Sequence, residues 1–344
     1  MSKTALITGI SGQDGAYLAK LLLSKGYRVI GAMRRSASLA LARLEYLGIA
    51  RDVEPFHCEL LELTNITRMI ERTKPDEIYN LAAQSFVSAS FDQPIFTVEV
   101  TGLGAVRLLE AIRLINPGAR FYQASTSEMF GNASRSPQDE NTPFRPRSPY
   151  GIAKLMAHNF AVNYREAYRM FCTSGILFNH ESPLRGREFV TRRITVGLAE
   201  VKHGHRGHLT LGNLDARRDW GFADDYVEGM WRMLQHAEAS DFVLATGAAT
   251  SVRRFVELAA RQFDFDIAWS GSGTDTIGTD TKSGRVVVRI DPEHYRPAEV
   301  HDLVGSPAKA AAQLGWRHKT SVDELAAMMA LEDDRRVRDG ITAY

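Results

Sequence analysis

The sequence lacks most of the features that mark a secreted, membrane-bound or strongly charged protein. Only 2 of its 344 residues are cysteines, Cys58 and Cys172. They lie far apart in apolar, strand-like runs, which favours two buried, reduced thiols over a disulfide framework. No secretory signal pattern opens the chain, and no apolar run approaches the roughly 18 residues that suggest a membrane span. The 42 basic and 41 acidic residues nearly cancel, so net charge gives no argument for nucleic acid or a membrane surface as a partner. We therefore expect a cytoplasmic globular protein.

Strand-like and helical segments alternate through the first half of the chain. Apolar runs typical of buried strands lie at residues 4–8, 28–33, 52–58, 77–81 and 120–124. Helical patterns lie between them at residues 17–24, 39–47, 65–72 and 98–115, and Thr64 is the expected cap of the third. This alternation predicts an α/β fold, a Rossmann-type doubly wound parallel sheet with helices on both faces.

The second half of the chain is less regular. A long helix is predicted at residues 150–168, a sixth strand at 172–178, and further helices near 190–201 and 225–234. Residues 270–284 are rich in Ser, Gly, Thr and Asp and are predicted to form a mobile loop. We expect residues 1–178 to form mainly a nucleotide-binding domain. Residues 179–344 would form a smaller C-terminal α/β substrate-binding part, with some chain returning to the first domain.

A glycine-rich turn follows the first strand. Residues 9–15 read GISGQDG and open the first helix, a context that favours a phosphate site over an ordinary turn. At the end of the second strand an NAD site carries an acidic residue, whereas this chain has Arg34, Arg35 and Ser36. Two guanidinium groups and a hydroxyl suit a 2′-phosphate, which a carboxylate would repel. The pattern therefore favours NADP over NAD.

Four polar residues indicate chemistry on a bound alcohol. Tyr150 and Lys154 are four residues apart on one predicted helix face, where a Lys ammonium favours the phenolate of a tyrosine. Thr126 and Glu128 follow the fifth strand, at the edge of the sheet where such folds bind ligands. A simple alcohol dehydrogenase needs no further carboxylate. Glu128 therefore suggests a second proton transfer, from a carbon beside a carbonyl.

Longer motifs give the chain a more specific resemblance. It resembles the extended short-chain dehydrogenase/reductase family and, more narrowly, the GDP-mannose 4,6-dehydratase family, over nearly its whole length. The matching strings are GISGQDG at 9–15, YNLAAQS at 79–85, QASTSEMFG at 123–131, SPYGIAK at 148–154, LFNHESPLRGRE at 177–188, LGNLDARRDWGFADDY at 211–226, RPAEV at 296–300 and LGW at 314–316.

The resemblance implies a closed redox cycle on GDP-mannose. Tyr150 would deprotonate the 4-hydroxyl while hydride leaves C4 for NADP, Thr126 would hydrogen-bond that hydroxyl, and Lys154 would hold the cofactor ribose. Glu128 would remove the C5 proton and then help the 6-hydroxyl leave as water. Hydride returning to C6 would give GDP-4-keto-6-deoxy-mannose, and the NADP would be tightly held and regenerated at each turnover. No metal is expected.

The resemblance also implies two sets of binding residues. Expected at the cofactor are Gly9, Ser11, Gly12, Gln13, Asp14, Gly15, Arg34, Arg35, Ser36, Glu59, Leu60, Leu81, Ala82, Ala83, Gln84, Ser85, Phe96, Lys154, His180 and Arg185. Expected at the nucleotide sugar are Ser85, Thr126, Glu128, Tyr150, Asn179, Arg185, Arg193, Asn213, Arg218, Arg296 and Glu299. The arginines suit a diphosphate.

Three departures from the family pattern leave the four catalytic residues intact. Glu59 stands where the family usually has Asp, Ala37 where it has Ser, and His301 where an acid usually follows the RPxEV string. The loop that carries Ala37 reaches a neighbouring subunit in relatives. Self-association to a homodimer or homotetramer is implied, and the sequence does not choose between them.

Several alternatives stay open or are disfavoured at this level. A related dehydratase acting on a GDP-heptose would have the same motifs. A 4-epimerase would need Tyr150 and Lys154 but not Glu128. A silent NADP-binding protein is disfavoured because all four catalytic residues are present, and nucleic-acid binding has no support.

Overall fold

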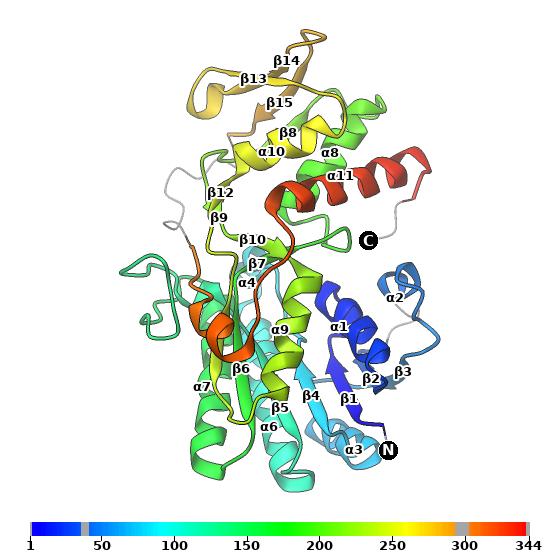
Figure 1. Cartoon of the computed structure of the whole chain (residues 1–344), viewed down its shortest axis with the longest axis vertical. Coiled ribbons are helices and arrows are strands. Elements are labelled where there is room, and N and C mark those ends of the chain that lie inside the picture. Colours follow the sequence, from blue (N-terminus) through cyan, green and yellow to red (C-terminus); the bar gives the residue numbers. More distant parts are fainter. Residues whose placement is uncertain (1, 36–40, 293–302, 342–344) are drawn as a thin grey trace.

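The computed structural model describes residues 2–35, 41–292 and 303–341. The chain forms a larger lobe around a parallel sheet and a smaller lobe above the carboxyl ends of its strands (Figure 1). No helix in the described ranges is both long and apolar enough to cross a membrane.

The larger lobe is built on seven parallel strands in the order β11-β6-β5-β4-β1-β2-β3. Their bounds are β1 (Thr4–Thr8), β2 (Arg28–Met33), β3 (Glu54–His57), β4 (Glu77–Asn80), β5 (Arg120–Thr126), β6 (Cys172–Leu177) and β11 (Asp241–Leu244). The order reverses between β1 and β4, which is where doubly wound folds open a ligand crevice. The predicted fold class is confirmed, and both cysteines are buried and unpaired.

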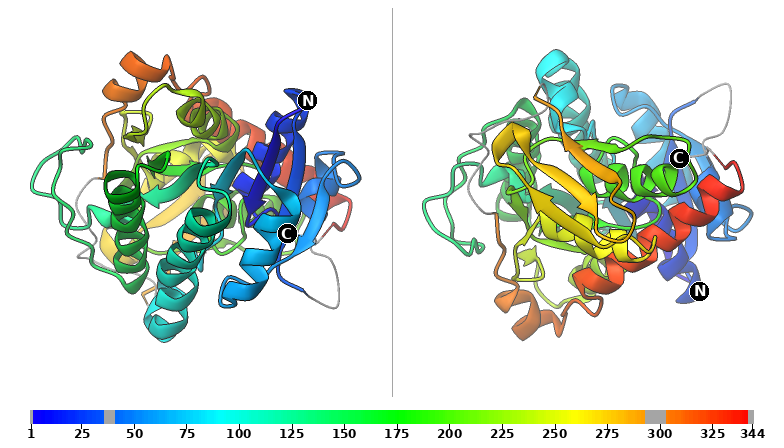
Figure 2. Two further views of the ribbon diagram at one scale, coloured as in Figure 1. Left: turned by 90° about the horizontal axis from the view of Figure 1, so that it is seen from below. Right: turned by 90° about the horizontal axis from the view of Figure 1, so that it is seen from above.

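Helices cover both faces of this sheet because the strands are apolar on both sides. In β1, Ala5 and Ile7 pack on one side with α1 and α9, while Leu6 packs on the other with α3, α6 and α7. Figure 2 shows the sheet between these layers. The helical segments of this lobe are α1 (Gln13–Ser24), α2 (Ala42–Tyr46), α3 (Leu63–Thr73), α4 (Val87–Asp92), α5 (Pro94–Thr97), η1 (Val98–Leu103), α6 (Gly104–Ile115), η2 (Ser127–Met129), α7 (Pro149–Tyr168), α9 (Ala223–Gln235) and η4 (Ala310–Leu314).

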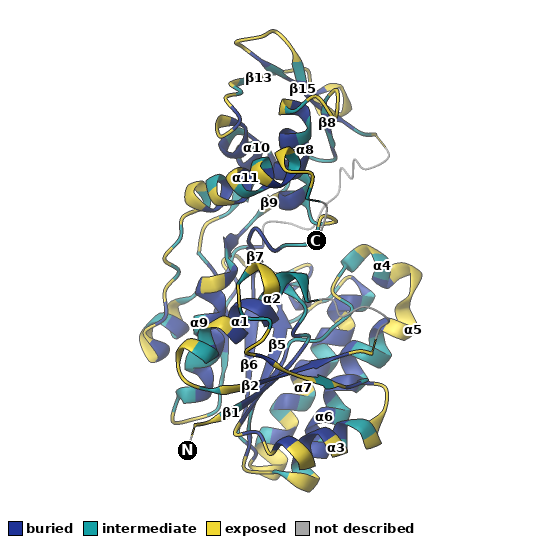
Figure 3. Ribbon diagram, turned by 90° about the vertical axis from the view of Figure 1, so that its right-hand side faces the viewer, coloured by how far each residue is buried: buried dark blue, intermediate teal, exposed yellow. Residues whose placement is uncertain are grey.

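The smaller lobe has its own apolar core, in which Leu198, Phe255 and Met329 meet from three helices. The inward faces are buried and the outer faces exposed (Figure 3). Its elements are α8 (Val190–Lys202), β8 (Leu209–Leu211), α10 (Val252–Arg261), β13 (Ile267–Ser270), η3 (Gly273–Asp275), β14 (Ile277–Asp280), β15 (Val286–Ile290) and α11 (Val322–Arg338). Short strands lie where the chain passes between the lobes, namely β7 (Asn179–Glu181), β9 (Arg217–Arg218), β10 (Trp220–Phe222) and β12 (Thr250–Ser251).

The helix predicted at 98–115 has the predicted bounds, and its first six residues form the π-helical segment η1. Two local predictions were wrong. The cap of α3 is Glu62, whose carboxylate accepts from the amide of Thr64, because the helix begins two residues earlier than a Thr64 cap would allow. Residues 270–284 contain β14, which pairs with β13 and β15 and is fixed by Asp280, so this segment is an ordered hairpin.

The carboxylate of Asp219 joins three segments at the boundary between the lobes. It accepts hydrogen bonds from the amides of Thr246, Gly247 and Gly305 at 2.8, 3.0 and 3.2 Å, and from the Thr246 hydroxyl at 2.6 Å. Asp219 is only 1% exposed. Water therefore cannot easily replace these bonds.

Replacing Asp219 by alanine should lower the free energy of unfolding by about 3 kcal/mol, because three backbone amides lose their acceptor. Urea unfolding followed by circular dichroism measures this change. Asp52→Ala, at an exposed position, is the matched control and should stay within about 0.5 kcal/mol. Equal stabilities of the two variants would contradict the structural role of Asp219.

Candidate active site

A cleft of about 600 Å³ opens at the carboxyl edge of the sheet, where the strand order reverses. Its walls come from the ends of β1, β4, β5 and β6, from the start of α7, and from β7 and the chain after it. Sixteen of the residues predicted from the sequence line it: Gly9, Gly12, Gln13, Asp14, Gly15, Leu81, Ala83, Ser85, Thr126, Glu128, Tyr150, Lys154, Asn179, His180, Arg185 and Arg218.

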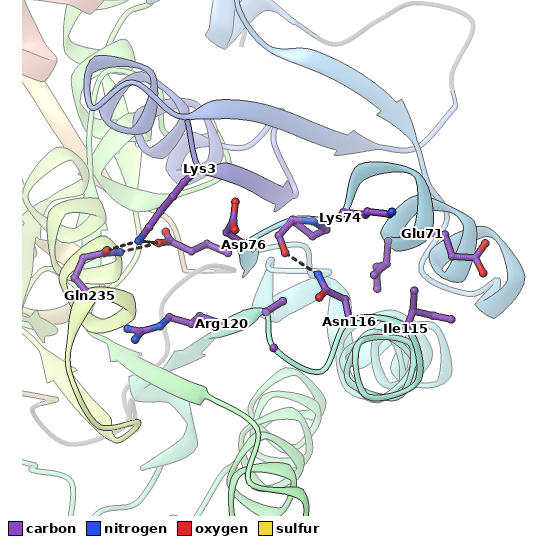
Figure 4. A pocket seen from close by; sticks show the side chains of 13 residues that line it. Lys3, Glu71, Lys74, Asp76, Ile115, Asn116, Arg120 and Gln235 are labelled. Carbon is purple, nitrogen blue, oxygen red and sulfur yellow. Dashed lines mark hydrogen bonds and ion pairs between the residues drawn. The ribbon is translucent and has the colours of Figure 1, made fainter. Parts of the chain in front are cut away.

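A larger hollow, of about 830 Å³, lies at the opposite, amino edge of the sheet (Figure 4). Several of its polar groups bond to one another. Lys3 donates to Glu77 at 2.9 Å, and Asn116 donates to the carbonyl of Pro75 at 2.8 Å. None of the sequence-predicted site residues lines it, so the smaller cleft is the candidate site.

The glycine turn is shaped for close approach of a ligand to the backbone. Gly9 has a φ of +72°, and a Cβ on Gly15 would lie 2.4 Å from the carbonyl oxygen of Gly9. The amide of Gly12 donates to that same oxygen at 2.9 Å. Helix α1 begins at Gln13, and no side chain caps it. Its first amides can therefore receive a phosphate.

Gly15→Ala should weaken binding of the expected cofactor, NADP, by about 10- to 100-fold, because the added methyl group forces the turn apart. Isothermal titration calorimetry with NADP measures the change. Gly207→Ala is the control, since a Cβ there meets no atom within 4 Å. An unchanged dissociation constant in Gly15→Ala would show that the turn does not bind the cofactor.

Tyr150 and Lys154 lie on the buried face of α7. Pro149 begins this helix, and Ser148 caps it by accepting from the amide of Gly151 at 3.1 Å. A Cβ on Gly151 would lie 2.9 Å from the carbonyl oxygen of Glu128. Glycine at this position therefore lets the start of α7 lie directly against η2, beside Glu128.

The ammonium of Lys154 donates to the carbonyl oxygen of Ala124 at 2.7 Å and lies 5.9 Å from the centre of the Tyr150 ring. Burial lowers the pKa of Lys154 to about 8. Burial also raises the pKa of Tyr150 above its ordinary value, although a hydrogen bond with Thr126 opposes this shift. A positive charge beside the phenol is thus what Tyr150 needs to act as a base.

Thr126 and Glu128 extend from the end of β5 toward the same space. The Thr126 hydroxyl accepts from the amide of Glu128 at 3.3 Å and so caps η2. The negative charge of Glu128 raises the pKa of Tyr150 further. A hydroxyl, a carboxylate, a phenol and an ammonium therefore converge on one cleft.

On the opposite wall, Arg185 is held by an ion pair with Glu181 at 3.0 Å and by the ring of Phe189, 3.5 Å from its guanidinium carbon. His180 bonds to Asp14 at 2.8 Å. Charged groups from β7 and the following loop thus meet the glycine turn.

Comparison with known proteins places this site in a family. A family model for GDP-mannose 4,6 dehydratase matches residues 6–329. A GDP-mannose 4,6-dehydratase of Sinorhizobium fredii is 52% identical over 338 residues, 96% of each chain. The human protein of that name is 48% identical over 343 residues, 97% of this chain and 92% of the relative. The chain belongs to the GDP-mannose 4,6-dehydratase family. The resemblance seen in the sequence is confirmed.

Solved structures share the fold at lower identity. A UDP-glucose 4-epimerase of Thermotoga maritima has a TM-score of 0.81 and 21% identity, with 97% of this chain and 99% of that chain covered. A dTDP-glucose 4,6-dehydratase of Bacillus anthracis, in complex with NAD, has a TM-score of 0.80 and 18% identity, with 98% of both chains covered. RMD of Pseudomonas aeruginosa, complexed with NADPH, has a TM-score of 0.77 and 21% identity, with 97% and 100% covered.

Not every residue expected from the family pattern lines the cleft. Leu60 packs in the sheet core, Phe96 is 38% exposed on α5, and the carbonyl of Ser11 accepts from Arg43. Also away from the cleft lining are Arg34, Arg35, Glu59, Ala82, Gln84, Arg193 and Asn213. Ser36, Arg296 and Glu299 lie outside the described residues. The roles of all these residues stay predictions.

The cleft also contains residues that the sequence analysis did not select. Within the family strings they are Ala124, Ser125, Ser127, Ser148, Leu177, Phe178 and Glu188, and outside them they are Phe86, Val87, Phe91, Arg147, Phe189 and Val190. Position in or beside a family string could have indicated most of them, for example Arg147 and Glu188. Phe91 carries no such signal, because apolar residues are equally frequent in cores.

Proposed function

We propose that this chain converts GDP-mannose to GDP-4-keto-6-deoxy-mannose and water, as an NADP-dependent lyase. The observation that carries the proposal is the convergence of Thr126, Glu128, Tyr150 and Lys154 on one cleft. The relatives named GDP-mannose 4,6-dehydratase, at 45–52% identity over nearly the whole chain, support the substrate.

The residues present fit a nicotinamide dinucleotide. The glycine turn leaves no room for a side chain at Gly15, which is the geometry that lets a pyrophosphate reach the backbone. Arg34 and Arg35 follow β2, where their charges favour the 2′-phosphate of NADP. When bound, NADP would take a hydride from C4 of the sugar and return it at C6.

The chain's own residues would move two protons. Tyr150 would accept the proton of the 4-hydroxyl at its phenolate oxygen, while Thr126 orients that hydroxyl. Glu128 would remove the C5 proton, which a carbonyl at C4 makes acidic, and donate it to the departing 6-hydroxyl, so one carboxyl group serves as base and as acid. The proton held by Tyr150 would then return to C5 as hydride is added at C6, which restores the phenolate.

Arg185, which follows β7, and Arg218, on β9, both line the cleft and would supply positive charge for a diphosphate. Self-association to a homodimer or homotetramer, which the family resemblance implies, and a cytoplasmic location, which the sequence composition favours, complete the proposal.

The test is incubation of the purified protein with GDP-mannose, without and with added NADP, followed by mass spectrometry. A product lighter by one water, with no net accumulation of NADPH, is expected. Turnover of a GDP-heptose but not of GDP-mannose would show that the substrate is a different nucleotide sugar and would leave the proposed mechanism unchanged. Inertness toward all nucleotide sugars, with NADP still bound, would refute catalysis.

A further inference from the structure

The pairing of Asp14 with His180 joins the two walls of the cleft. Asp14 lies in the glycine turn at the start of α1, and His180 lies on β7, next to Asn179. Their side chains meet at 2.8 Å between Oδ2 and Nε2. We propose that His180 is held as a permanent imidazolium by Asp14, and that this ion pair is a positioning latch that couples the cofactor turn to the substrate wall.

The hydrogen bonds around His180 determine its charge without reference to its titration. Its Nδ1 lies 2.7 Å from the carbonyl oxygen of Phe178, which can only accept. Its Nε2 faces Asp14, which can only accept if it is ionised. Both ring nitrogens must then carry hydrogen, which makes the ring a cation.

The hydrogen bonds of Gln13 assign one oxygen of Asp14 as an acceptor. The amide nitrogen of Gln13 donates to the carbonyl oxygen of His180 at 3.1 Å, which fixes the orientation of the amide. The same nitrogen donates to Oδ1 of Asp14 at 3.0 Å. The Gln13 oxygen accepts from the Ser182 hydroxyl at 2.7 Å, and Ser182 accepts from the amide of Leu184 at 3.0 Å. One proton then lies between Oδ2 of Asp14 and Nε2 of His180. Because an imidazole is ordinarily more basic than a carboxylate, with pKa values near 6.5 and 3.9, this proton belongs to His180, and Asp14 is ionised.

The surroundings stabilise this charge state. The ring of Tyr226, from α9, stacks on His180 with centroids 4.7 Å apart and planes 22° apart, a geometry that favours a cation. Two further cations lie near the pair. Arg185 is itself paired with Glu181, and Lys154 interacts with the charge of Asp14. Burial opposes the charge on His180, but the charge and hydrogen bond of Asp14 outweigh it and raise the pKa of His180. Burial likewise opposes ionisation of Asp14, and His180 outweighs it and lowers the pKa of Asp14 to about 2.

The latch has a mechanical consequence. Two consecutive residues of the cofactor turn, Gln13 and Asp14, are both bonded to β7 and the chain after it. That chain carries Asn179 and Arg185, which face the cleft. A ligand that orders the turn must therefore also order β7. The coupling rests on the proposed function in one respect, namely that NADP binds the turn.

The charge state is tested by nitrogen-15 NMR of the protein without ligand at pH 8, where a histidine of ordinary pKa, near 6.5, is neutral. The His180 signal is assigned by its loss in His180→Gln. Two protonated ring nitrogens are expected in the parent protein and one in Asp14→Asn. A neutral His180 ring in the parent protein overturns the proposal. This result is measured on the parent protein, and the His180→Gln variant is needed only to assign the signal.

The coupling is tested by hydrogen exchange with and without NADP, read by mass spectrometry over residues 178–185 and over the glycine turn. In the parent, NADP should slow exchange in both segments, by about tenfold at β7. In Asp14→Asn the effect should persist at the turn and become clearly smaller at β7, where only the hydrogen bonds of Gln13 still join the two segments.

The control is Asp241→Asn, which breaks a pair with Arg165 at 2.8 Å between α7 and β11, with similar burial. It should lower stability without altering the exchange coupling. Equal slowing at β7 in the parent and in Asp14→Asn overturns the latch. Slowing in neither segment of the parent refutes NADP as the cofactor, while the NMR result still decides the ion pair.

Discussion

Glu128→Gln should lower the rate of water loss from GDP-mannose by about 10²- to 10⁴-fold, the range lost with a general acid–base group. Glutamine has nearly the same shape, so the cap that Thr126 provides to η2 is kept. It cannot, however, take a proton from C5 or deliver one to the 6-hydroxyl. In the proposed mechanism oxidation at C4 depends on Tyr150, so it should continue in this variant. The variant should therefore form NADPH in a single turnover and stop there, which absorbance at the nicotinamide band detects by stopped flow.

Glu128→Asp is the informative companion to this variant. It keeps a carboxylate but withdraws it by one methylene, so part of the lost rate should return. Water loss at the parent rate in Glu128→Gln would show that another group removes the C5 proton. Loss of the single-turnover NADPH signal would instead show that Glu128 acts at the oxidation step.

Lys154→Met should make the cofactor-free protein more stable while abolishing most activity. Burial lowers the pKa of Lys154 from 10.5 to about 8. At about 1.36 kcal/mol per pKa unit, the folded state loses about 3 kcal/mol by keeping the ammonium charged. Methionine has a similar length and no charge. The carbonyl oxygen of Ala124 accepts from Lys154 and also from the side-chain amide of Gln123, the latter at 3.0 Å. It would therefore still have a donor in Lys154→Met.

The sign of this effect sets its pH dependence. Because the pKa of a base is depressed on folding, the penalty is complete below pH 8 and disappears as pH rises through 10.5. Urea unfolding at pH 7 should thus show a gain of about 2–3 kcal/mol in Lys154→Met, shrinking toward pH 10. Lys20→Met, at an exposed position, should show neither change. A less stable Lys154→Met would mean that the hydrogen bond to Ala124 outweighs burial of the charge.

The sequence was most informative where local pattern and tertiary position agree. The strands at residues 4–8 and 28–33 were predicted to the residue, because short β-branched and aliphatic runs between polar ends are typical of buried strands in an α/β fold. The helices α10 and α11 were not predicted. Their apolar residues matter only through a second core, which α8 and β15 complete from distant parts of the chain. Likewise Asp280 orders residues 270–284 through bonds that composition does not reveal.

Part of the candidate site could likewise be predicted from the sequence and part could not. The sequence indicated Tyr150, Lys154, Thr126 and Glu128, because the proposed chemistry requires these residue types at the ends of particular strands and helices. The contact of Asp14 with His180 spans 166 residues of sequence. No periodicity connects two such positions. Arg34 and Arg35 directly follow the end of β2, as the sequence predicted, but they do not line the cleft.

The position of β11 has a consequence for how the chain can be divided. This strand comes from the second half of the sequence but pairs with β6 at the end of the sheet. A fragment that stops at residue 178 would leave β6 as a bare edge, with its amides and carbonyls open to any other strand. It would also lack α9, which covers one face of the sheet against α1. Such a fragment should aggregate rather than fold, and the two lobes should appear as one cooperative unit in calorimetry. Because the chain passes between the lobes five times, with α9, β11 and η4 returning to the larger lobe, shuffling of substrate lobes between relatives would need five crossover points.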